Sequence, residues 1–243
     1  MKVHAVTDVG RVRETNQDFC SYTTEPIGAL PNLFLVADGM GGHRSGDLAS
    51  RFTVETFREL VQNYDSFDTV TILTDAVKEV NKLLIRKSLE SPDYEGMGTT
   101  LVAATIEGNM LKVANVGDSR LYLIKDDICQ ITRDHSLVEE MVQRGQLEKD
   151  EARTHANKNI ITRAIGVDND VTPELFSVDI EKGSKILICT DGLTNMVDDN
   201  KIERLVKKGG TVRDITERLV TAALDGGGKD NITVMVIDPD SER

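Results

Sequence analysis

Residues 33–43 read LFLVADGMGGH, an apolar run that ends on an aspartate and continues into a glycine cluster. A strand that is apolar at every position has no face suited to water, so both of its faces must be covered. Residues 186–189 and 232–237 are also apolar at nearly every position. Because strands and helices do not alternate regularly along the chain, a doubly wound parallel sheet is disfavoured. The sequence therefore predicts an α+β fold, a four-layer α-β-β-α sandwich of two mainly antiparallel sheets flanked by helices.

The spacing of apolar residues predicts the elements of this sandwich. Apolar runs bounded by turn residues predict strands over 3–7, 19–23, 33–37, 100–106, 110–115, 120–125, 128–132, 175–179, 185–190 and 232–237. Apolar residues at helical spacing predict helices over 46–62, 70–89, 136–144, 200–207 and 212–224.

The composition of the chain is typical of a globular protein, and its acidic net charge disfavours binding to polyanions. Of its 243 residues, 39% are hydrophobic and 29% are charged, and no repeat or Pro/Ser-rich linker interrupts them. We therefore expect a single domain over 1–243. The formal net charge of −12 disfavours nucleic acid or an anionic membrane as a partner. The apolar runs are far too short for a membrane span, and residues 1–10 lack the features of a signal peptide.

The cysteines bear on the cellular compartment. Cys20, Cys129 and Cys189 are odd in number, widely spaced and embedded in predicted strands. This usage favours reduced, buried thiols and hence a cytoplasmic protein.

Five aspartates stand at the ends of predicted strands. Asp38, Asp118 and Asp191 follow the last residues of their strands, whereas Asp18 and Asp230 precede the first residues of theirs. In antiparallel sheets these two kinds of strand end meet at one rim. The sequence therefore predicts that five carboxylates cluster there.

Such a cluster needs positive charge. Converging carboxylates repel one another and raise their own pKa values unless cations neutralise them. Oxygen ligands without histidine or cysteine partners favour Mg²⁺ or Mn²⁺, and two such ions can hold a phosphoryl group for attack. A single Asp-Gly pair is most often a turn, and only the joint placement of five aspartates favours metal. Arg13, shortly before Asp18, has the donors for bidentate phosphate binding, although a lone loop arginine is commonly only solvated.

Motifs in the same order along the whole chain resemble the metal-dependent PPM/PP2C-type protein Ser/Thr phosphatases, specifically their compact bacterial branch. The motifs are RVRETNQD at 11–18, VADGMGGHRSGD at 36–47, MGTTLVAA at 97–104, ANVGDSRLY at 114–122, RDHSLV at 133–138, ITRAIG at 161–166, LICTDGL at 187–193 and GGGKDNITVMVI at 226–237.

The resemblance implies two core Mn²⁺ or Mg²⁺ ions. It implies that Asp38 bridges them and that the Gly39 carbonyl contributes. Asp191 and Asp230 would complete the ligand set of one of the ions, and Asp18 would act through metal-bound water.

The resemblance also assigns residues around those ions. Asp118 matches the residue that, with Asp191, builds a third, weaker metal site in bacterial members. Arg13 would bind the substrate phosphate. Asn231 and Gln17 would lie behind the ligands, where Asn231 orders Asp230 and the neutral Gln17 stands in place of a glutamate.

The identity of the general acid stays open in the sequence. Many eukaryotic relatives carry a histidine where this chain has Met40, and His43 three residues later is one hypothesis for the proton donor, with a metal-bound water as the other. Residues 145–166 resemble the mobile flap of the family. Within it His155 and Arg163 are candidates for substrate contact, although His155 can equally be a solvated loop histidine.

The expected activity is hydrolysis of phosphoserine and phosphothreonine monoesters in proteins, by in-line attack of a metal-bridging hydroxide. The resemblance implies a protein that reverses the action of a bacterial Ser/Thr kinase on its substrates, and we expect it to be a cytoplasmic monomer. Two alternatives remain open: a non-catalytic metal-binding regulator that docks phosphoproteins, and a phosphatase of small molecules.

Overall fold

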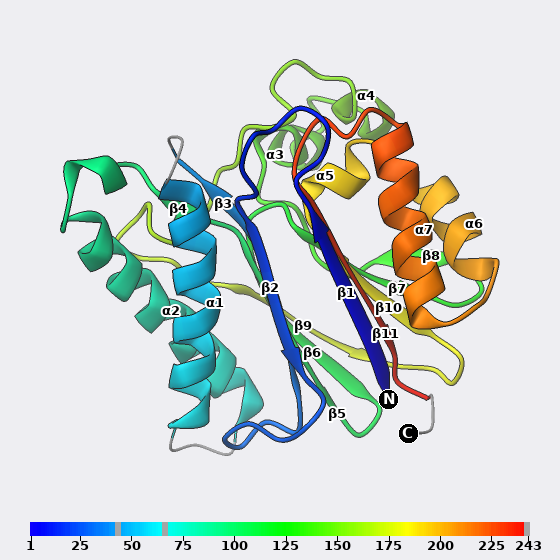
Figure 1. Ribbon diagram of the computed structural model, residues 1–243, viewed down its shortest axis with the longest axis horizontal. Helices are drawn as coiled ribbons and strands as arrows, with labels where there is room; N and C mark the ends of the chain where they lie inside the picture. The colour runs from blue at the N-terminus through cyan, green and yellow to red at the C-terminus, as the bar shows by residue number, and fades with distance from the viewer. Residues whose placement is uncertain (42–44, 65–67, 241–243) are drawn as a thin grey trace.

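Two antiparallel sheets form the centre of the molecule, and helices cover both of their outer faces (Figure 1). The computed structural model describes residues 1–41, 45–64 and 68–240. One sheet has the order β1-β11-β10-β7-β8 and the other the order β2-β3-β5-β6-β9, with the short β4 paired to β3.

The strand bounds follow the predicted ranges closely. The first sheet contains β1 (Lys2–Asp8), β11 (Ile232–Asp238), β10 (Lys185–Cys189), β7 (Arg120–Ile124) and β8 (Ile128–Gln130). The second contains β2 (Asp18–Thr23), β3 (Leu33–Met40), β4 (Gly98–Thr99), β5 (Leu101–Glu107), β6 (Met110–Val116) and β9 (Glu174–Asp179).

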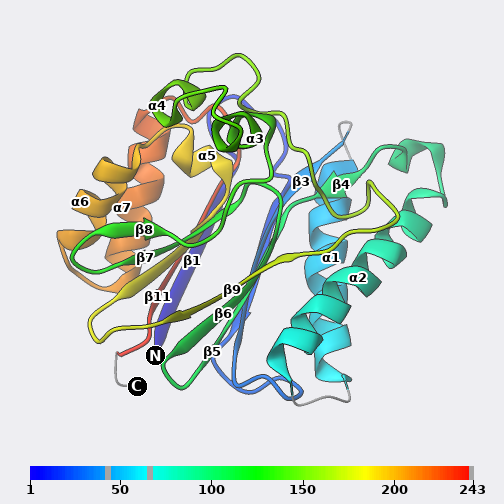
Figure 2. The same cartoon turned by 180° about the vertical axis from the view of Figure 1, so that it is seen from behind.

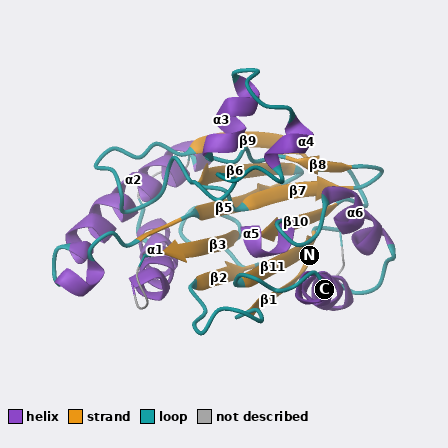
Figure 3. Cartoon of the chain, turned by 90° about the horizontal axis from the view of Figure 1, so that it is seen from above, coloured by secondary structure: helices purple, strands orange, loops and turns teal. Residues whose placement is uncertain are grey.

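The helices form the two outer layers and one end of the sandwich. Figure 2 shows one pair of helices outside the second sheet and another group outside the first. The pair is α1 (Ser45–Gln62) and α2 (Thr69–Ser88), followed by a 3-10 turn at Pro92–Tyr94. The group is α5 (Asp191–Thr194), α6 (Asp199–Lys207) and α7 (Val212–Asp225), and the short α3 (Leu137–Gln143) and α4 (Lys149–Ala152) lie across one end (Figure 3).

Three apolar cores hold these four layers together, one between each pair of neighbouring layers. In β3, Leu33, Leu35 and Ala37 pack in the core shared with α1 and α2. Phe34 and Val36 point the other way, into the core between the two sheets. A third core lies between the first sheet and α6 and α7. The unbroken apolar run of β3 therefore reflects burial of both faces, and the predicted four-layer sandwich is confirmed.

The strands that carry Asp18 and Asp38 extend further than predicted. Asp18 is the first residue of β2, and Asp38 lies inside β3 and is its direct partner across the antiparallel pair. The extension of β3 arises because β4 pairs with Gly39 and Met40. Elements as short as β4, α4 and α5 contain too few residues to show a periodicity, so the sequence did not predict them.

One expectation about the cysteines is wrong. Cys189 is buried and Cys20 is half-buried, but Cys129 is exposed, and none of the three is in a disulfide. Cys129 lies in β8, which is an edge strand of its sheet. An edge strand has fewer neighbours to cover it than a central strand, so its apolar sequence did not imply burial.

The flap segment predicted over 145–166 lies at the same end of the sandwich as α3. It contains α4 and returns to the sandwich through two isolated bridges, Ser136 with Ile161 and Thr99 with Ile165. Within the ranges described above, no helix is both long and apolar enough to cross a membrane.

Candidate active site

The five predicted aspartates gather at the end of the sandwich that carries the flap. Asp18 and Asp38 face each other in β2 and β3, and Asp191 is the first residue of α5. Asp118 lies in the turn between β6 and β7, and Asp230 lies just before β11. The negative charges of the other four aspartates each raise the pKa of Asp38, so all four lie within electrostatic reach of Asp38.

Asp38 is held by its backbone. Its N–H donates to Thr100 Oγ1 at 2.9 Å, and its carbonyl oxygen accepts from Thr99 Oγ1 at 2.8 Å. Burial raises the pKa of the Asp38 carboxyl well above its usual range, and the charge of Asp18 raises it further. The backbone of Asp38 is therefore fixed, and its carboxyl group lies buried among like charges.

Asp18 is the most enclosed carboxylate of the cluster, with 5% of its surface exposed. Its Oδ2 accepts a hydrogen bond from Thr190 Oγ1 at 2.8 Å, whereas its Oδ1 is buried without a hydrogen-bond partner. Burial raises the pKa of Asp18 to about 7, and the charges of Asp191 and Asp230 act in the same direction. A buried carboxylate oxygen without a donor is costly unless a cation meets it.

Asp191 follows β10 of the first sheet, and Asp118 lies in the turn that crosses from β6 of the second sheet to β7 of the first. Asp118 is buried, and its Oδ1 also has no hydrogen-bond partner. Its pKa is raised by burial first and then by the charge of Asp191. The pKa of Asp191 is raised to about 6 by burial and by the charge of Asp230, against which the positive charges of Arg120 and Lys158 lower it.

Two glycines allow the backbone to come this close. A Cβ atom at Gly39 would lie 2.0 Å from the carbonyl oxygen of Gly46, at the start of α1. A Cβ atom at Gly192 would lie 1.8 Å from the carbonyl oxygen of Asn231. No side chain fits at either distance, so the approach of Asp38 to α1, and of Asp191 to Asp230, depends on glycine.

Arg13 lies at the edge of the cluster with 52% of its side chain exposed. Its Nη2 donates to Asp230 Oδ2 at 2.8 Å. The predicted phosphate-binding residue thus lies beside the predicted metal ligands, with its guanidinium accessible from solvent.

Asn231 holds the loop that carries Arg13. Its Nδ2 donates to the carbonyl oxygens of Val9 and Thr15, both at 2.9 Å, and its Oδ1 accepts from the Gln17 N–H at 2.8 Å. Its own N–H donates to Asp230 Oδ1 at 2.9 Å. Asn231 therefore contacts Asp230, a predicted ligand, and it fixes the Arg13 loop as much as it fixes Asp230.

Gln17 contributes mainly through its backbone. Its carbonyl oxygen accepts from the Gly39 N–H at 3.0 Å and from Ser50 Oγ at 2.6 Å. Its side-chain amide packs against Gly46, where an added Cβ would approach Nε2 to 2.6 Å. Gln17 thus joins β3 to α1 beside Asp38.

The candidates for the general acid and for substrate contact are His43, His155 and Arg163, and the structure describes two of them. His43 lies outside the described residues. His155 is half-buried in the flap, where its Nδ1 accepts from the Asn157 N–H at 3.1 Å. Arg163 is exposed and lies near His135, whose pKa is lowered first by burial and also by the Arg163 charge. The predicted substrate contacts of His155 and Arg163 stay predictions.

Divalent cations fit this donor set. Two buried carboxylate oxygens lack partners, and the pKa values of four aspartates are raised, so the cluster is short of positive charge. Within the described part of the chain, no three Asp, Glu, His or Cys side chains are arranged to hold one ion by themselves. Mg²⁺ keeps several water molecules and takes only one or two protein carboxylates, so such an ion suits this open arrangement.

Several residues that organise the site carried no signal that the sequence could reveal. Thr100 Oγ1 accepts from the Asp38 N–H and lies 2.8 Å from Ser119 Oγ, which links the two sheets beside the cluster. Arg120 makes a bidentate pair with Asp134 and lowers the pKa of nearby Asp118. Hydroxyl and amide residues are common in loops of every kind, so only tertiary contacts reveal their positions.

Comparisons with known proteins show the family to which the chain belongs. A family model described as protein phosphatase 2C matches residues 10–225. The serine/threonine phosphatase stp of Listeria monocytogenes is 39% identical over 243 residues, which cover 96% of this chain and 94% of that protein. The protein phosphatase PhpP of Streptococcus pneumoniae is 37% identical and covers 100% of this chain and 99% of its own.

Solved structures agree with the observed fold. The crystal structure of the serine/threonine phosphatase Stp1 from Staphylococcus aureus has a TM-score of 0.92 and 35% identity, and the match covers 99% of this chain and 95% of that one. The catalytic domain of the phosphatase PstP, solved in complex with two manganese ions, has a TM-score of 0.85 and 34% identity, with 97% and 96% covered. The chain therefore belongs to the protein phosphatase 2C family of metal-dependent serine/threonine protein phosphatases.

Proposed function

We propose that this protein hydrolyses phosphoserine and phosphothreonine monoesters in proteins at the five-aspartate cluster. The observation that carries the proposal is the shortage of positive charge there: Asp18 Oδ1 and Asp118 Oδ1 are buried without partners. Water alone does not offset so much buried negative charge, whereas divalent cations do.

The residues that would hold these cations are the ones the family resemblance names. Asp38, the Gly39 carbonyl, Asp191 and Asp230 would hold two core Mn²⁺ or Mg²⁺ ions, and Asp18 would act through water. When bound, the ions supply an activated water and neutralise the phosphoryl oxygens. Asp118, with its unpartnered Oδ1, would add a third and weaker site.

The chain's own residues would orient the phosphate. Arg13 is fixed at the edge of the cluster by Asp230 and is half-exposed, so its planar fork can turn from the carboxylate to two phosphoryl oxygens. Asn231 keeps the Arg13 loop against the site through its bonds to Val9 and Thr15. Without that clamp the guanidinium would have to be ordered each time a substrate bound.

The biological setting is proposed from the same resemblance. The phosphoproteins would be products of a bacterial Ser/Thr kinase, and the kinase itself would be a partner. We propose that residues 1–243 form one catalytic domain that acts as a cytoplasmic monomer. The net charge of −12 gives no support to nucleic-acid binding.

The direct test is phosphate release from a phosphothreonine peptide. Wild-type protein with Mn²⁺ should release phosphate, and EDTA or Asp191→Asn should reduce the rate at least about a hundredfold, since each removes charge stabilisation of the transition state. Glu217→Gln, which changes an exposed carboxylate on α7, is the matched control and should keep the wild-type rate.

The other outcomes separate the alternatives. Full activity in EDTA would refute the cation role. Mn²⁺ binding without hydrolysis of any phosphopeptide would favour a docking regulator. If the protein hydrolysed small phosphate esters but no phosphopeptide, a small-molecule phosphatase would be favoured. For the acid, His43→Ala can be assayed on esters whose leaving groups differ in pKa, because a lost proton donor slows poor leaving groups most.

A further inference from the structure

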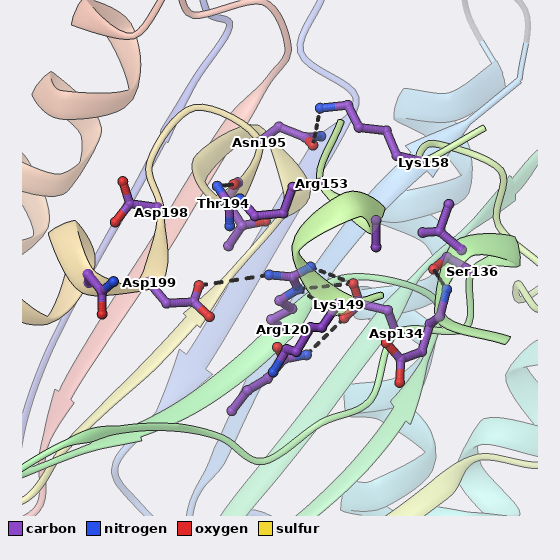
Figure 4. A pocket seen from close by; sticks show the side chains of 15 residues that line it. Arg120, Asp134, Ser136, Lys149, Arg153, Lys158, Thr194, Asn195, Asp198 and Asp199 are labelled. Carbon is purple, nitrogen blue, oxygen red and sulfur yellow. Dashed lines mark hydrogen bonds and ion pairs between the residues drawn. The ribbon is translucent and has the colours of Figure 1, made fainter. Parts of the chain in front are cut away.

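A cavity of about 390 Å³ lies between the flap and residues of α5 and α6 (Figure 4). Two cationic flap side chains cross its edge to reach the end of α5. Arg153 Nη2 donates to the Thr194 carbonyl oxygen at 3.2 Å, and Lys158 Nζ donates to Asn195 Oδ1 at 3.0 Å. The flap is thus attached to Thr194 and Asn195, which lie three and four residues after Asp191.

Asn195 has a second hydrogen bond on its other side. Its Nδ2 donates to Asp191 Oδ2 at 2.8 Å, and its backbone N–H donates to the Asp191 carbonyl oxygen at 2.7 Å. The orientation of the amide is fixed by chemistry, because the opposite one would place NH₂ against an ammonium and an oxygen against a carboxylate. One side chain therefore bridges Lys158 and Asp191.

We propose that Asn195 is a positioning residue with two roles: it orients Asp191 for cation binding, and it anchors the flap through Lys158. The inference rests on the proposed cation role of Asp191. It follows that the flap and the cation site share one side chain, so a change at Asn195 must affect both.

The Arg153 and Lys158 contacts differ in the kind of acceptor atom that each requires on α5 and the residue after it. Arg153 binds a backbone oxygen, which any residue at position 194 supplies. Lys158 binds a side-chain oxygen that only Asn195 supplies here. The positive charge of Lys158 also lowers the pKa of Asp191, so Lys158 acts on the ligand by its field as well as through the amide.

Paired measurements on the full chain test both roles. Asn195→Ala should weaken Mn²⁺ binding about tenfold in isothermal titration, as loss of a ligand-orienting hydrogen bond does at metal sites. It should also speed amide hydrogen exchange in residues 149–160, measured without metal. A serine at 195 would reach neither neighbour, so Asn195→Ser replaces the alanine variant if that variant melts below the assay temperature.

The Lys158 variants isolate the flap role. Lys158→Ala should speed exchange in the flap as much as Asn195→Ala, but change Mn²⁺ affinity less, because removing a nearby positive charge offsets any loss of order. Lys158→Arg keeps a donor and a charge and should restore protection. Lys149→Ala is the matched control, since Lys149 lines the same cavity without a described hydrogen bond to α5.

Either unchanged Mn²⁺ affinity or unchanged flap exchange in Asn195→Ala would overturn the two-role inference. Equal flap loosening by Lys149→Ala would also overturn it, because the effect would then be one of general charge. If wild-type protein bound no Mn²⁺ at all, the proposed function would fail first, and the inference would fail with it. The wild-type titration therefore separates the two failures.

Discussion

Thr190 satisfies one oxygen of the most enclosed carboxylate. Its hydroxyl donates to Asp18 Oδ2 at 2.8 Å and accepts from the Thr233 N–H at 3.0 Å. Thr190→Val keeps the shape but leaves both groups unsatisfied in a buried place. We expect the free energy of unfolding, from urea denaturation in EDTA, to fall by about 1–3 kcal/mol.

A second threonine provides the control for that variant. Thr221 Oγ1 bonds the Glu217 carbonyl oxygen on the exposed side of α7, so Thr221→Val should change stability by less than about 0.5 kcal/mol. Equal effects of the two variants would show that the Asp18 contact adds nothing.

Gly192 tests how closely the two strand ends must approach. Because a Cβ there would lie 1.8 Å from the Asn231 carbonyl oxygen, Gly192→Ala must push Asp191 away from Asp230. We expect a loss of about 2–3 kcal/mol in unfolding free energy and at least about tenfold weaker Mn²⁺ binding, from denaturation and titration.

Gly183→Ala is the comparison for Gly192→Ala. Gly183 has φ of +88° and no atom near its Cβ position, so the cost is backbone strain of about 1 kcal/mol without any effect on Mn²⁺. Wild-type Mn²⁺ affinity in Gly192→Ala would mean that the close approach serves packing alone.

The sequence predicted the acidic residues of the site but not the residues that hold them. Asp38 and Asp191 could be found because each ends an apolar run that must be a buried strand. Thr190 and Asn195 could not be found in this way. Their partners, Asp18 and Lys158, are 172 and 37 residues away in the sequence, and no local pattern links residues so far apart. The role of His43 as the proton donor stays a hypothesis from the sequence, with a metal-bound water as the alternative.

At the scale of elements, β7 is tied to the entry of α3 by a charged pair. Arg120 donates to both oxygens of Asp134 at 2.7–3.0 Å, and these side chains are 22% and 13% exposed. Arg120→Met would leave Asp134 buried without its cation. We expect unfolding free energy to fall by about 3 kcal/mol, measured by urea denaturation.

Arg144→Met breaks a pair of the same chemistry at the surface. Arg144 and Glu140 are 65% and 36% exposed, so their loss should cost no more than about 0.5 kcal/mol. If both variants lost the same amount, burial of the Arg120 pair would not be the reason for its effect.

The spacing of apolar residues was sufficient to predict the four layers, but it did not predict the short helices and strands. Long apolar stripes predicted α1, α2 and α7 to within about one or two residues, because those helices bury one face each. The extension of β3 to Asp38 and Met40 depends on a two-residue partner, β4, which leaves no pattern. Tertiary pairing therefore decided what local sequence could not.

At the scale of the whole molecule, stability without metal should depend on pH in an unusual direction. The Asp18 carboxyl has a native pKa raised to about 7 from 3.8, so the native state keeps a proton that the unfolded state releases. The contribution of this proton to the free energy of unfolding is complete below pH 3.8 and is lost as the pH rises through about 7.

Asp18→Asn imitates the protonated form at every pH. In EDTA we expect this variant to melt above wild type at pH 7.5, by at least about 4 °C, and the difference to shrink at pH 5. Thermal melts at the two pH values measure this, and added Mn²⁺ should reduce the difference. A variant that melted below wild type at pH 7.5 in EDTA would contradict the raised pKa.

The net charge of −12 would repel a phosphorylated substrate if the aspartate cluster stayed bare. Catalysis on a phosphorylated substrate therefore requires divalent cations among those five residues. The most direct measurement is anomalous diffraction at the manganese edge from crystals soaked in MnCl₂. We predict peaks between Asp38, Asp191 and Asp230, whereas saturating Mn²⁺ with no peak among these aspartates would contradict the account.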